Sequence, residues 1–136
     1  MFDPATVSYL LFALLIGHFL GDIIVQTDHQ AAHKNLPGAR GRRACLAHVI
    51  GYGITQTIVV VALVAVADIE VHPLALTAGL TLSIATHYPL DRGPVLAWLA
   101  GITRSPKFWE TQMGRLLIDQ VSHLVMIAVA AIVINL

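Results

Sequence analysis

The chain has 136 residues, of which 57% are hydrophobic and 12% are charged, and its mean hydropathy is +0.76. Soluble globular proteins have about twice this share of charged residues, so the composition excludes an ordinary soluble domain and indicates a membrane protein. The length suits one domain, residues 1–136. The formal net charge is zero and no motif of a nucleic-acid-binding module is present, so we expect no nucleic-acid partner.

Four apolar runs follow one another along the chain, at residues 7–25, 47–67, 74–90 and 116–136. A membrane-spanning helix needs about 20 mostly apolar residues, so the third run is marginal in length. The first run has no basic residues before it and no cleavage site after it, and it is therefore interpreted as a mature helix rather than a signal peptide. The runs predict an all-α polytopic membrane protein, a four-transmembrane-helix up-down bundle.

The basic residues occur in only two segments, which connect runs one and two and runs three and four. They are Lys34, Arg40, Arg42 and Arg43 in the first segment, and Arg92, Arg104, Lys107 and Arg115 in the second. The N-terminal stub and the short connection 68–73 carry only acidic charges. The positive-inside rule therefore predicts that both long loops are cytoplasmic and that both termini lie outside the cytoplasm.

Each long loop shows a helix signal. Thr27 offers an N-cap for a short interfacial helix over residues 27–34, and we expect Pro37, Gly38 and Gly41 to break the chain after it. In the second long loop, Ser105-Pro106 opens a segment over residues 107–115 that we expect to merge into the fourth span.

Seven ionisable residues lie within the predicted spans. They are His18, Asp22, His48, His87, Asp91, Asp119 and His123. Each costs about 2.5–3.5 kcal/mol on insertion scales, which makes such residues functional candidates. Six of them form pairs spaced i, i+4, so that each pair projects from one helix face. The pairs end runs one and three but begin run four, so an up-down bundle brings all seven into one shallow cytoplasmic layer.

Four imidazoles and three carboxylates at matching depth favour a metal site. The single Cys45 excludes a thiolate-rich site and an intrachain disulfide, so the donors are nitrogen and oxygen. This donor set suits a first-row divalent ion, zinc above all, with manganese and iron as alternatives, and one or two ions bridged by an aspartate. Any one of these residues alone is more often a helix–helix hydrogen-bond partner.

An ion or proton pathway is an alternative, because transporters also place such groups within spans. It would need polar groups through the whole membrane depth, whereas residues 59–66 and 126–134 are almost purely aliphatic. A path within one protomer is therefore disfavoured, while a path between protomers stays open. A homo-oligomer is consistent with Gly51, Gly53 and Gly79, which allow close approach between helices.

Other polar residues are candidates for supporting roles. Gln26 and Gln120 lie beside the predicted ligands and are candidates for orienting them. Lys34, Arg92 and Arg115 ring the expected mouth of the site and are candidates for binding an anionic substrate, although the topology rule alone also accounts for them.

Three histidines are set aside. His29 and His33 form another i, i+4 pair, but they lie on a polar segment where solvated histidines are expected. His72 lies at the opposite membrane face and is expected to be exposed.

The polar pattern also matches a known family. It consists of His18-x-x-Gly21-Asp22-x-x-x-Gln26, Lys34, His48, His87-x-x-x-Asp91 and Asp119-Gln120-x-x-His123. Over nearly the whole chain this pattern resembles the domain of unknown function 3307 family (DUF3307) of small bacterial and phage integral membrane proteins. The resemblance implies a bacterial inner-membrane location, supports these positions as a set, and carries no established activity. The array is also similar in layout to bacterial membrane proteins described as metal-dependent hydrolases.

The leading hypothesis from the sequence is a membrane-embedded metal-dependent hydrolase. The metal ligands are His18, Asp22, His48, His87, Asp91, Asp119 and His123, and the candidate general bases are Asp22, Asp91 and Asp119. The metal would activate water for attack on an anionic phosphoester or lipid-like substrate. Two alternatives remain, a non-enzymatic metal-binding or ion-translocating protein and a structural or phage-related membrane partner.

Overall fold

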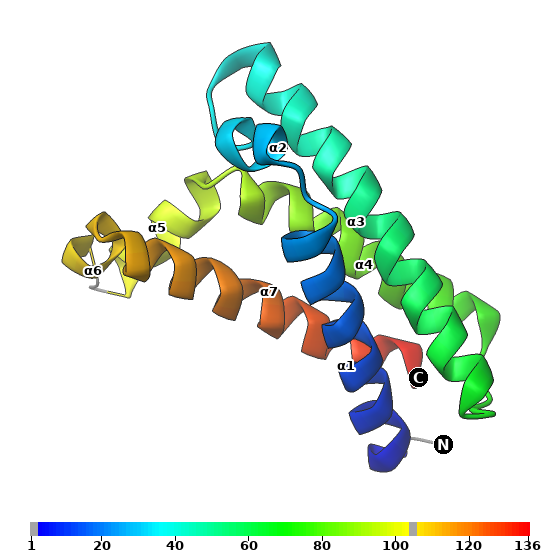
Figure 1. Ribbon diagram of the computed structural model, residues 1–136. Helices are drawn as coiled ribbons and strands as arrows, with labels where there is room; N and C mark the ends of the chain where they lie inside the picture. Colours follow the sequence, from blue (N-terminus) through cyan, green and yellow to red (C-terminus); the bar gives the residue numbers. More distant parts are fainter. Residues whose placement is uncertain (1–2, 104–105) are drawn as a thin grey trace.

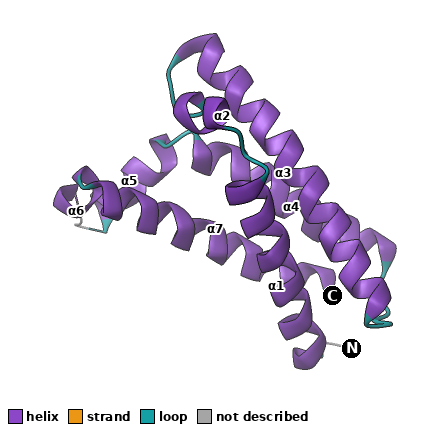
Figure 2. Cartoon of the chain, in the orientation of Figure 1, coloured by secondary structure: helices purple, strands orange, loops and turns teal. Residues whose placement is uncertain are grey.

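The structure, a computed structural model, describes residues 3–103 and 106–136 (Figure 1). All regular secondary structure in these residues is helical (Figure 2). The elements are α1 (Pro4–Phe19) with a π-helical continuation η1 (Leu20–Ile24), α2 (Asp28–His33), α3 (Gly38–Val66), α4 (Pro73–Asp91), α5 (Pro94–Ile102), α6 (Pro106–Glu110) and α7 (Gln112–Ile134). Arg104 and Ser105, which were expected in the second basic loop, lie outside the described residues.

Side-chain caps determine where several helices begin. The Asp3 carboxylate accepts hydrogen bonds from the backbone N–H groups of Ala5 and Thr6, at 3.1 and 3.0 Å, and so starts α1. Thr27 starts α2 through a reciprocal capping box with Gln30. The short helix predicted after Thr27 is therefore present.

The start of α3 differs from the prediction. The helix begins at Gly38 instead of residue 47, and Gly41 lies within it, so the expectation that Gly41 breaks the chain is wrong. Of these two glycines, Gly38 alone has the positive φ, 78°, of a chain reversal. Gly41 instead provides room for the backbone carbonyl of Leu36, which a Cβ atom would displace.

The second long loop is more helical than predicted. Gly93, with φ 87°, ends α4, and Pro94 at the first position starts α5, which the sequence patterns did not indicate. The segment expected to merge into the fourth span is interrupted at Thr111. The Thr111 hydroxyl accepts a hydrogen bond from the N–H of Gly114, 2.9 Å away, and starts α7 as a separate helix.

The four long helices pack as a ring of neighbours, with α1 against α3 and α7, and α4 against α3 and α7 (Figure 1). Glycines allow the closest approaches. A Cβ on Gly79 of α4 would lie 2.8 Å from the carbonyl oxygen of Ala130 in α7. Gly53 likewise faces Ile84 of α4, so two of the glycines considered for oligomerisation already pack within the chain.

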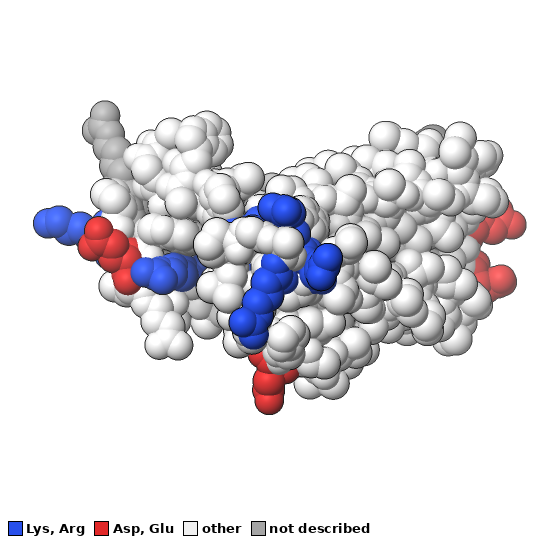
Figure 3. All heavy atoms as spheres, turned by 90° about the horizontal axis from the view of Figure 1, so that it is seen from above, with Lys and Arg blue, Asp and Glu red and all other residues white. Residues whose placement is uncertain are grey.

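Three helices in the described chain are long and apolar enough to cross a membrane: Pro4–Ile24, Gly38–Val66 and Gln112–Ile134. The 19-residue α4 is not among them. Large apolar side chains are exposed on these helices, for example Phe12 (57%) and Ile58 (63%). Seen from above, Lys and Arg side chains gather over one part of the molecule together with some acidic side chains, while further acidic side chains project at the opposite end (Figure 3).

Candidate metal centre

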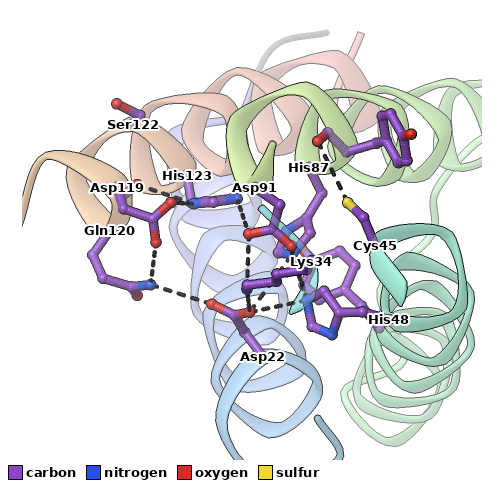
Figure 4. A network of polar contacts seen from close by, with 12 residues as sticks. Asp22, Lys34, Cys45, His48, His87, Asp91, Asp119, Gln120, Ser122 and His123 are labelled. Atoms are coloured by element: carbon purple, nitrogen blue, oxygen red, sulfur yellow. Dashed lines mark hydrogen bonds and ion pairs between the residues drawn. The ribbon is translucent and has the colours of Figure 1, made fainter. Parts of the chain in front are cut away.

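The seven residues predicted from the sequence lie in one polar cluster, where the end of α1, the first half of α3, the end of α4 and the start of α7 meet. Figure 4 labels all of them except His18. The cluster is buried. His18, His48 and His87 are at most 1% exposed, and Asp22 and Asp91 are each 5% exposed. Buried charges of this kind require partners, because desolvation disfavours an isolated ion strongly.

The π-helical turn η1 brings Asp22 into the cluster. Turns of this type are rare and are frequently found at functional sites. Gly21, in the same turn, lies so close to α3 that a Cβ atom would come within 3.1 Å of the Cα of Tyr52. One turn earlier, Gly17 makes the same close approach to Gln56. The two glycines therefore let α1 lie against α3, with Asp22 beside His48.

Four side chains converge on one point, each with one nitrogen or oxygen. His48 Nε2 lies 3.1 Å from each of three atoms, Asp22 Oδ1, Asp91 Oδ2 and His87 Nε2. His87 Nε2 lies 3.6 Å from Asp22 Oδ1 and 3.3 Å from Asp91 Oδ2. Ligands about 2.0–2.2 Å from a tetrahedral zinc ion are separated by about 3.3–3.6 Å, since a tetrahedron's edge is about 1.63 times its centre-to-corner distance. The observed separations are close to this value.

A second group of potential ligands adjoins the first. Asp91, Asp119 and His123 each offer an atom within 4.8 Å of the others. His123 Nδ1 donates to the backbone carbonyl of Asp119, 3.0 Å away, which leaves its Nε2 with a lone pair and no hydrogen-bond partner in the described chain. This Nε2 lies 3.9 Å from Asp91 Oδ1. Asp91 therefore faces both groups, with Oδ2 toward the first group and Oδ1 toward the second.

Lys34 inserts its ammonium between two of the carboxylates. Its Nζ lies 2.9 Å from Asp91 Oδ1 and 3.4 Å from Asp22 Oδ1. Burial lowers the pKa of Lys34, but the carboxylates of Asp91 and Asp22 outweigh this effect and hold its pKa above the ordinary value. Lys34 was predicted to bind substrate at the mouth of the site; its ammonium contacts the two carboxylates, and the residue also borders the cavities that reach the cluster.

Gln120, which was predicted to orient ligands, contacts three members of the cluster. Its Nε2 donates to Asp22 Oδ2 and to Asp119 Oδ2, both at 3.2 Å, and its Oε1 lies 3.3 Å from His18 Nε2. His18 itself is 3.9 Å from Asp22 Oδ2 and does not belong to either ligand group. Its hydrogen-bond contact with the cluster is the one to Gln120.

A polar chain that the sequence patterns did not indicate supports His87 from the interior. The ring of Tyr52 stacks on His87 with centroids 3.8 Å apart. Its hydroxyl accepts a hydrogen bond from Gln56 Nε2, 2.7 Å away, and lies 3.2 Å from the Ser83 hydroxyl. Tyr52 lies one turn beyond His48 and Gln56 one turn beyond Tyr52, and this spacing is the signal that places all three on one face of α3.

The remaining predicted accessory residues lie around the cluster. Gln26 donates to the backbone carbonyl of Asp22, at 3.0 Å, rather than to its carboxylate. Arg92 donates to the backbone carbonyl of Lys34, at 2.6 Å, and so holds the segment that carries the ammonium. Arg115 donates to the carbonyl of Trp109, at 3.1 Å.

The histidines that were set aside lie away from the two ligand groups. His29 and His33 stack on each other, and Arg40 donates to His33 Nε2, 2.7 Å away. His72 accepts a hydrogen bond from the N–H of Leu74, at 3.3 Å, and caps α4. Its expected exposure is confirmed, with this capping contact in addition.

Two cavities reach the cluster. One, of about 470 Å³, is lined by Lys34, Asp91, Arg115 and Asp119 among others. The other, of about 560 Å³, opens between α1 and α7. Asp119 and Lys34 border both cavities, so the second ligand group is the more accessible of the two.

Comparison with known families gives one match. The sequence model of the family described as Protein of unknown function (DUF3307) matches residues 10–136. The chain therefore belongs to this family, which confirms the resemblance drawn from the polar pattern. No curated protein and no solved structure matches the chain.

Proposed function

We propose that this DUF3307 protein is a membrane-embedded, metal-dependent hydrolase that acts on an anionic phosphoester. The observation that carries the proposal is the set of four ligand atoms from η1, α3 and α4. The five separations that involve His48 or His87 are 3.1–3.6 Å and all four atoms lie within 4.8 Å of one another, which suits one tetrahedral divalent ion. Hydrogen bonding alone does not require two imidazole nitrogens to point at each other across 3.1 Å. Zinc fits this donor set best, with manganese and iron as alternatives.

The proposed topology has four spans in a single domain. At about 1.5 Å per residue, the 19 residues of α4 extend about 28 Å, close to the roughly 30 Å of a bilayer's hydrocarbon core. We place the two basic loops and the metal centre on the cytoplasmic side, with α2 at the interface, because basic residues prefer that side. The membrane is then the bacterial inner membrane, with both termini outside the cytoplasm.

The two ligand groups suit different roles. A site with four protein ligands is closed, whereas a catalytic metal keeps a position for water. The first group has four ligands and the second, Asp91, Asp119 and His123, has three. A second ion held by these three residues would leave one position open, beside the cavities. Bound water there would be activated as a nucleophile.

Asp119 is the best candidate for the general base. Its side chain is 23% exposed, whereas those of Asp22 and Asp91 are at most 5% exposed and are held by His48 and His87. Asp119 would take the proton of the attacking water. The new bond would join the water oxygen to phosphorus, the ester P–O bond would break, and the departing alkoxide would take up the proton that Asp119 removed from the water.

Charge balance favours an anionic substrate in this arrangement. Three carboxylates, two divalent ions and the Lys34 ammonium leave two positive charges, which a phosphate monoester dianion would balance. Without the second ion, one divalent ion and Lys34 already balance the three carboxylates. We therefore infer that the second ion and the substrate bind together.

A second candidate function is metal binding without catalysis. It is favoured by the closed geometry of the first ligand group and by Lys34, which balances charge without a second ion. Ion translocation through one protomer is disfavoured by the aliphatic core around Leu14, Val60 and Ile127. An assay of phosphoester hydrolysis distinguishes the metal-dependent hydrolase from a protein that binds metal without catalysis.

Elemental analysis of the detergent-purified protein tests the proposal. We expect at least one equivalent of a divalent first-row metal in the wild type, little in His87→Ala, and reduced content with loss of hydrolysis in Asp119→Ala. His29→Ala is the matched control, since His29 is a histidine outside both ligand groups, and it should leave metal content unchanged. A wild-type protein that neither co-purifies with metal nor takes it up would overturn the proposal.

A further inference from the structure

The two cavities at the cluster differ in the elements that border them. The cavity of about 470 Å³ lies next to the basic loops, at Asn35, Gly93 and Arg115, and is also lined by the apolar side chains of Leu90, Leu96, Trp109 and Leu116. The cavity of about 560 Å³ is bordered at its outer side by Phe19 and Ile23 of α1 and η1, and by Leu117 of α7. Its inner end is polar, with Asp22, Lys34, Asp119 and Gln120. The second cavity is therefore amphipathic along its length.

The apolar side of this cavity lies on helices that are candidate membrane spans. Phe19 is 43% exposed, Ile23 is 61% exposed and Leu117 is 46% exposed. In a bilayer these side chains face lipid, because no other described element covers them. The cavity then opens sideways into the membrane, whereas the other opens toward the loops.

From this pair of openings we propose that the substrate is a membrane amphiphile with a phosphate monoester head, and that it enters sideways between α1 and α7. This inference rests on the proposed function. The head lies at Lys34 and Asp119, next to the three-ligand group. The hydrocarbon chain lies along Phe19, Ile23 and Leu117, and water reaches the head through the other cavity.

The physical reason is that the cavity between α1 and α7 offers polar contacts for the head at its inner end and apolar contacts for the chain at its outer side. A free phosphate would leave the three apolar side chains without a role, and a neutral lipid would leave the cationic centre unbalanced. The acyl chain leaves surroundings that are as apolar as the groove, so these contacts add little net affinity and the head must supply the selectivity over neutral lipids.

The experiment uses the full chain, loaded with zinc, in nanodiscs of phosphatidylcholine that contain phosphatidic acid with a photoreactive acyl chain. We expect labelling to concentrate at residues 19–23 and on the first half of α7. Unlabelled phosphatidic acid should remove the label, and inorganic phosphate at the same concentration should not. Equal competition by inorganic phosphate would identify a free anion as the ligand and overturn the proposal.

A matched pair of variants tests the groove itself. Ile23→Trp fills the cavity and should lose most of the labelling and the hydrolysis of the lipid substrate, with unchanged metal content. Ile24→Trp adds the same bulk at the neighbouring exposed position, 71% exposed and outside this cavity, and should retain both. Uniform labelling of exposed apolar residues, including Ile58, would mean bulk lipid contact only and would also overturn the proposal.

The same samples test the proposed metal-dependent hydrolase separately from the proposed lateral entry of a lipid. Metal content by elemental analysis reports on the metal centre and does not depend on lipid. Specific labelling in a protein that binds no metal would refute the proposed hydrolase while leaving the lateral groove supported. Bound metal with no specific labelling would refute the lateral groove and leave the metal centre supported.

Discussion

The two ends of the helix bundle are held together by different interactions. At one end, buried ionisable groups such as Asp22, His48 and Asp91 contact one another from several helices. At the other end, the core is purely aliphatic and contains Leu10, Leu14, Val60, Val64 and Ile127 among its members. The first end depends on charge balance, and the second on how closely the backbones approach.

In a membrane, the two ends of the bundle are stabilised in different ways. Lipid is as apolar as the aliphatic core, so helices associate there through close packing, and glycine is what permits it. In the polar end, the alternative to a well-arranged cluster is a set of unsatisfied charges in a medium of low dielectric constant. We therefore expect metal to stabilise the polar end and packing variants to affect the aliphatic end, independently of each other.

Removal of metal should have the largest effect. Bound metal at about 100 times its dissociation constant stabilises the folded state by about 2.7 kcal/mol, so a chelator should lower the unfolding midpoint of the wild type. Asp91→Asn removes the aspartate that faces both ligand groups and should make the midpoint insensitive to chelator. Thermal unfolding in detergent measures both. An unfolding midpoint of the wild type that changes with neither chelator nor added zinc would contradict the claim that metal stabilises the polar end.

Gly79→Val should destabilise the aliphatic end by about 1–3 kcal/mol, because the added atoms meet the Ala130 carbonyl at 2.8 Å. Metal content should stay the same, since Gly79 lies outside the polar cluster. Gly101→Val, in α5, is the control, because no atom of the described residues lies within 4 Å of an added Cβ there. Equal destabilisation by both variants would show that the close approach of α4 and α7 is unimportant.

Tyr52→Phe should cost about 1 kcal/mol, since it removes the hydroxyl that contacts Gln56 and Ser83 and retains the ring that stacks on His87. Zinc affinity should fall less than in His87→Ala. Tyr9→Phe removes a hydroxyl that donates to the Leu63 carbonyl, 2.8 Å away, at the aliphatic end. It should reduce stability similarly and leave zinc affinity unchanged, which a zinc titration of both variants will check.

The smallest effect is expected at Asp3. A side-chain hydrogen bond from Thr6, together with backbone hydrogen bonds from Thr6 and Ala5, lowers the pKa of Asp3. Because the folded-state pKa is below the unfolded one, the carboxylate stabilises the protein above the ordinary aspartate pKa, and this contribution is lost as pH falls through the folded-state value. Asp3→Asn should lower the unfolding midpoint slightly at neutral pH. A difference that persists in strong acid would contradict this cause.

The gathering of the polar cluster could be predicted from residue spacing alone. His87 with Asp91 and Asp119 with His123 are each four apart, so each pair must share a helix face, and alternating helices bring the pairs to one end. The position of Lys34 could not be predicted, because it depends on how α2 folds back over the bundle. Helix α5 was missed because nine residues directly after an apolar run resemble its continuation or a loop.

By itself the sequence determined the helical class, the family and the set of polar residues, since hydrophobic periodicity and i, i+4 spacing are local properties. Only the tertiary structure decided how those residues divide between two ligand groups. The division depends on separations of a few ångströms between atoms on different helices. These separations follow from the π-helical turn at Asp22, the close approach of Gly21 to α3, and the shared position of Asp91.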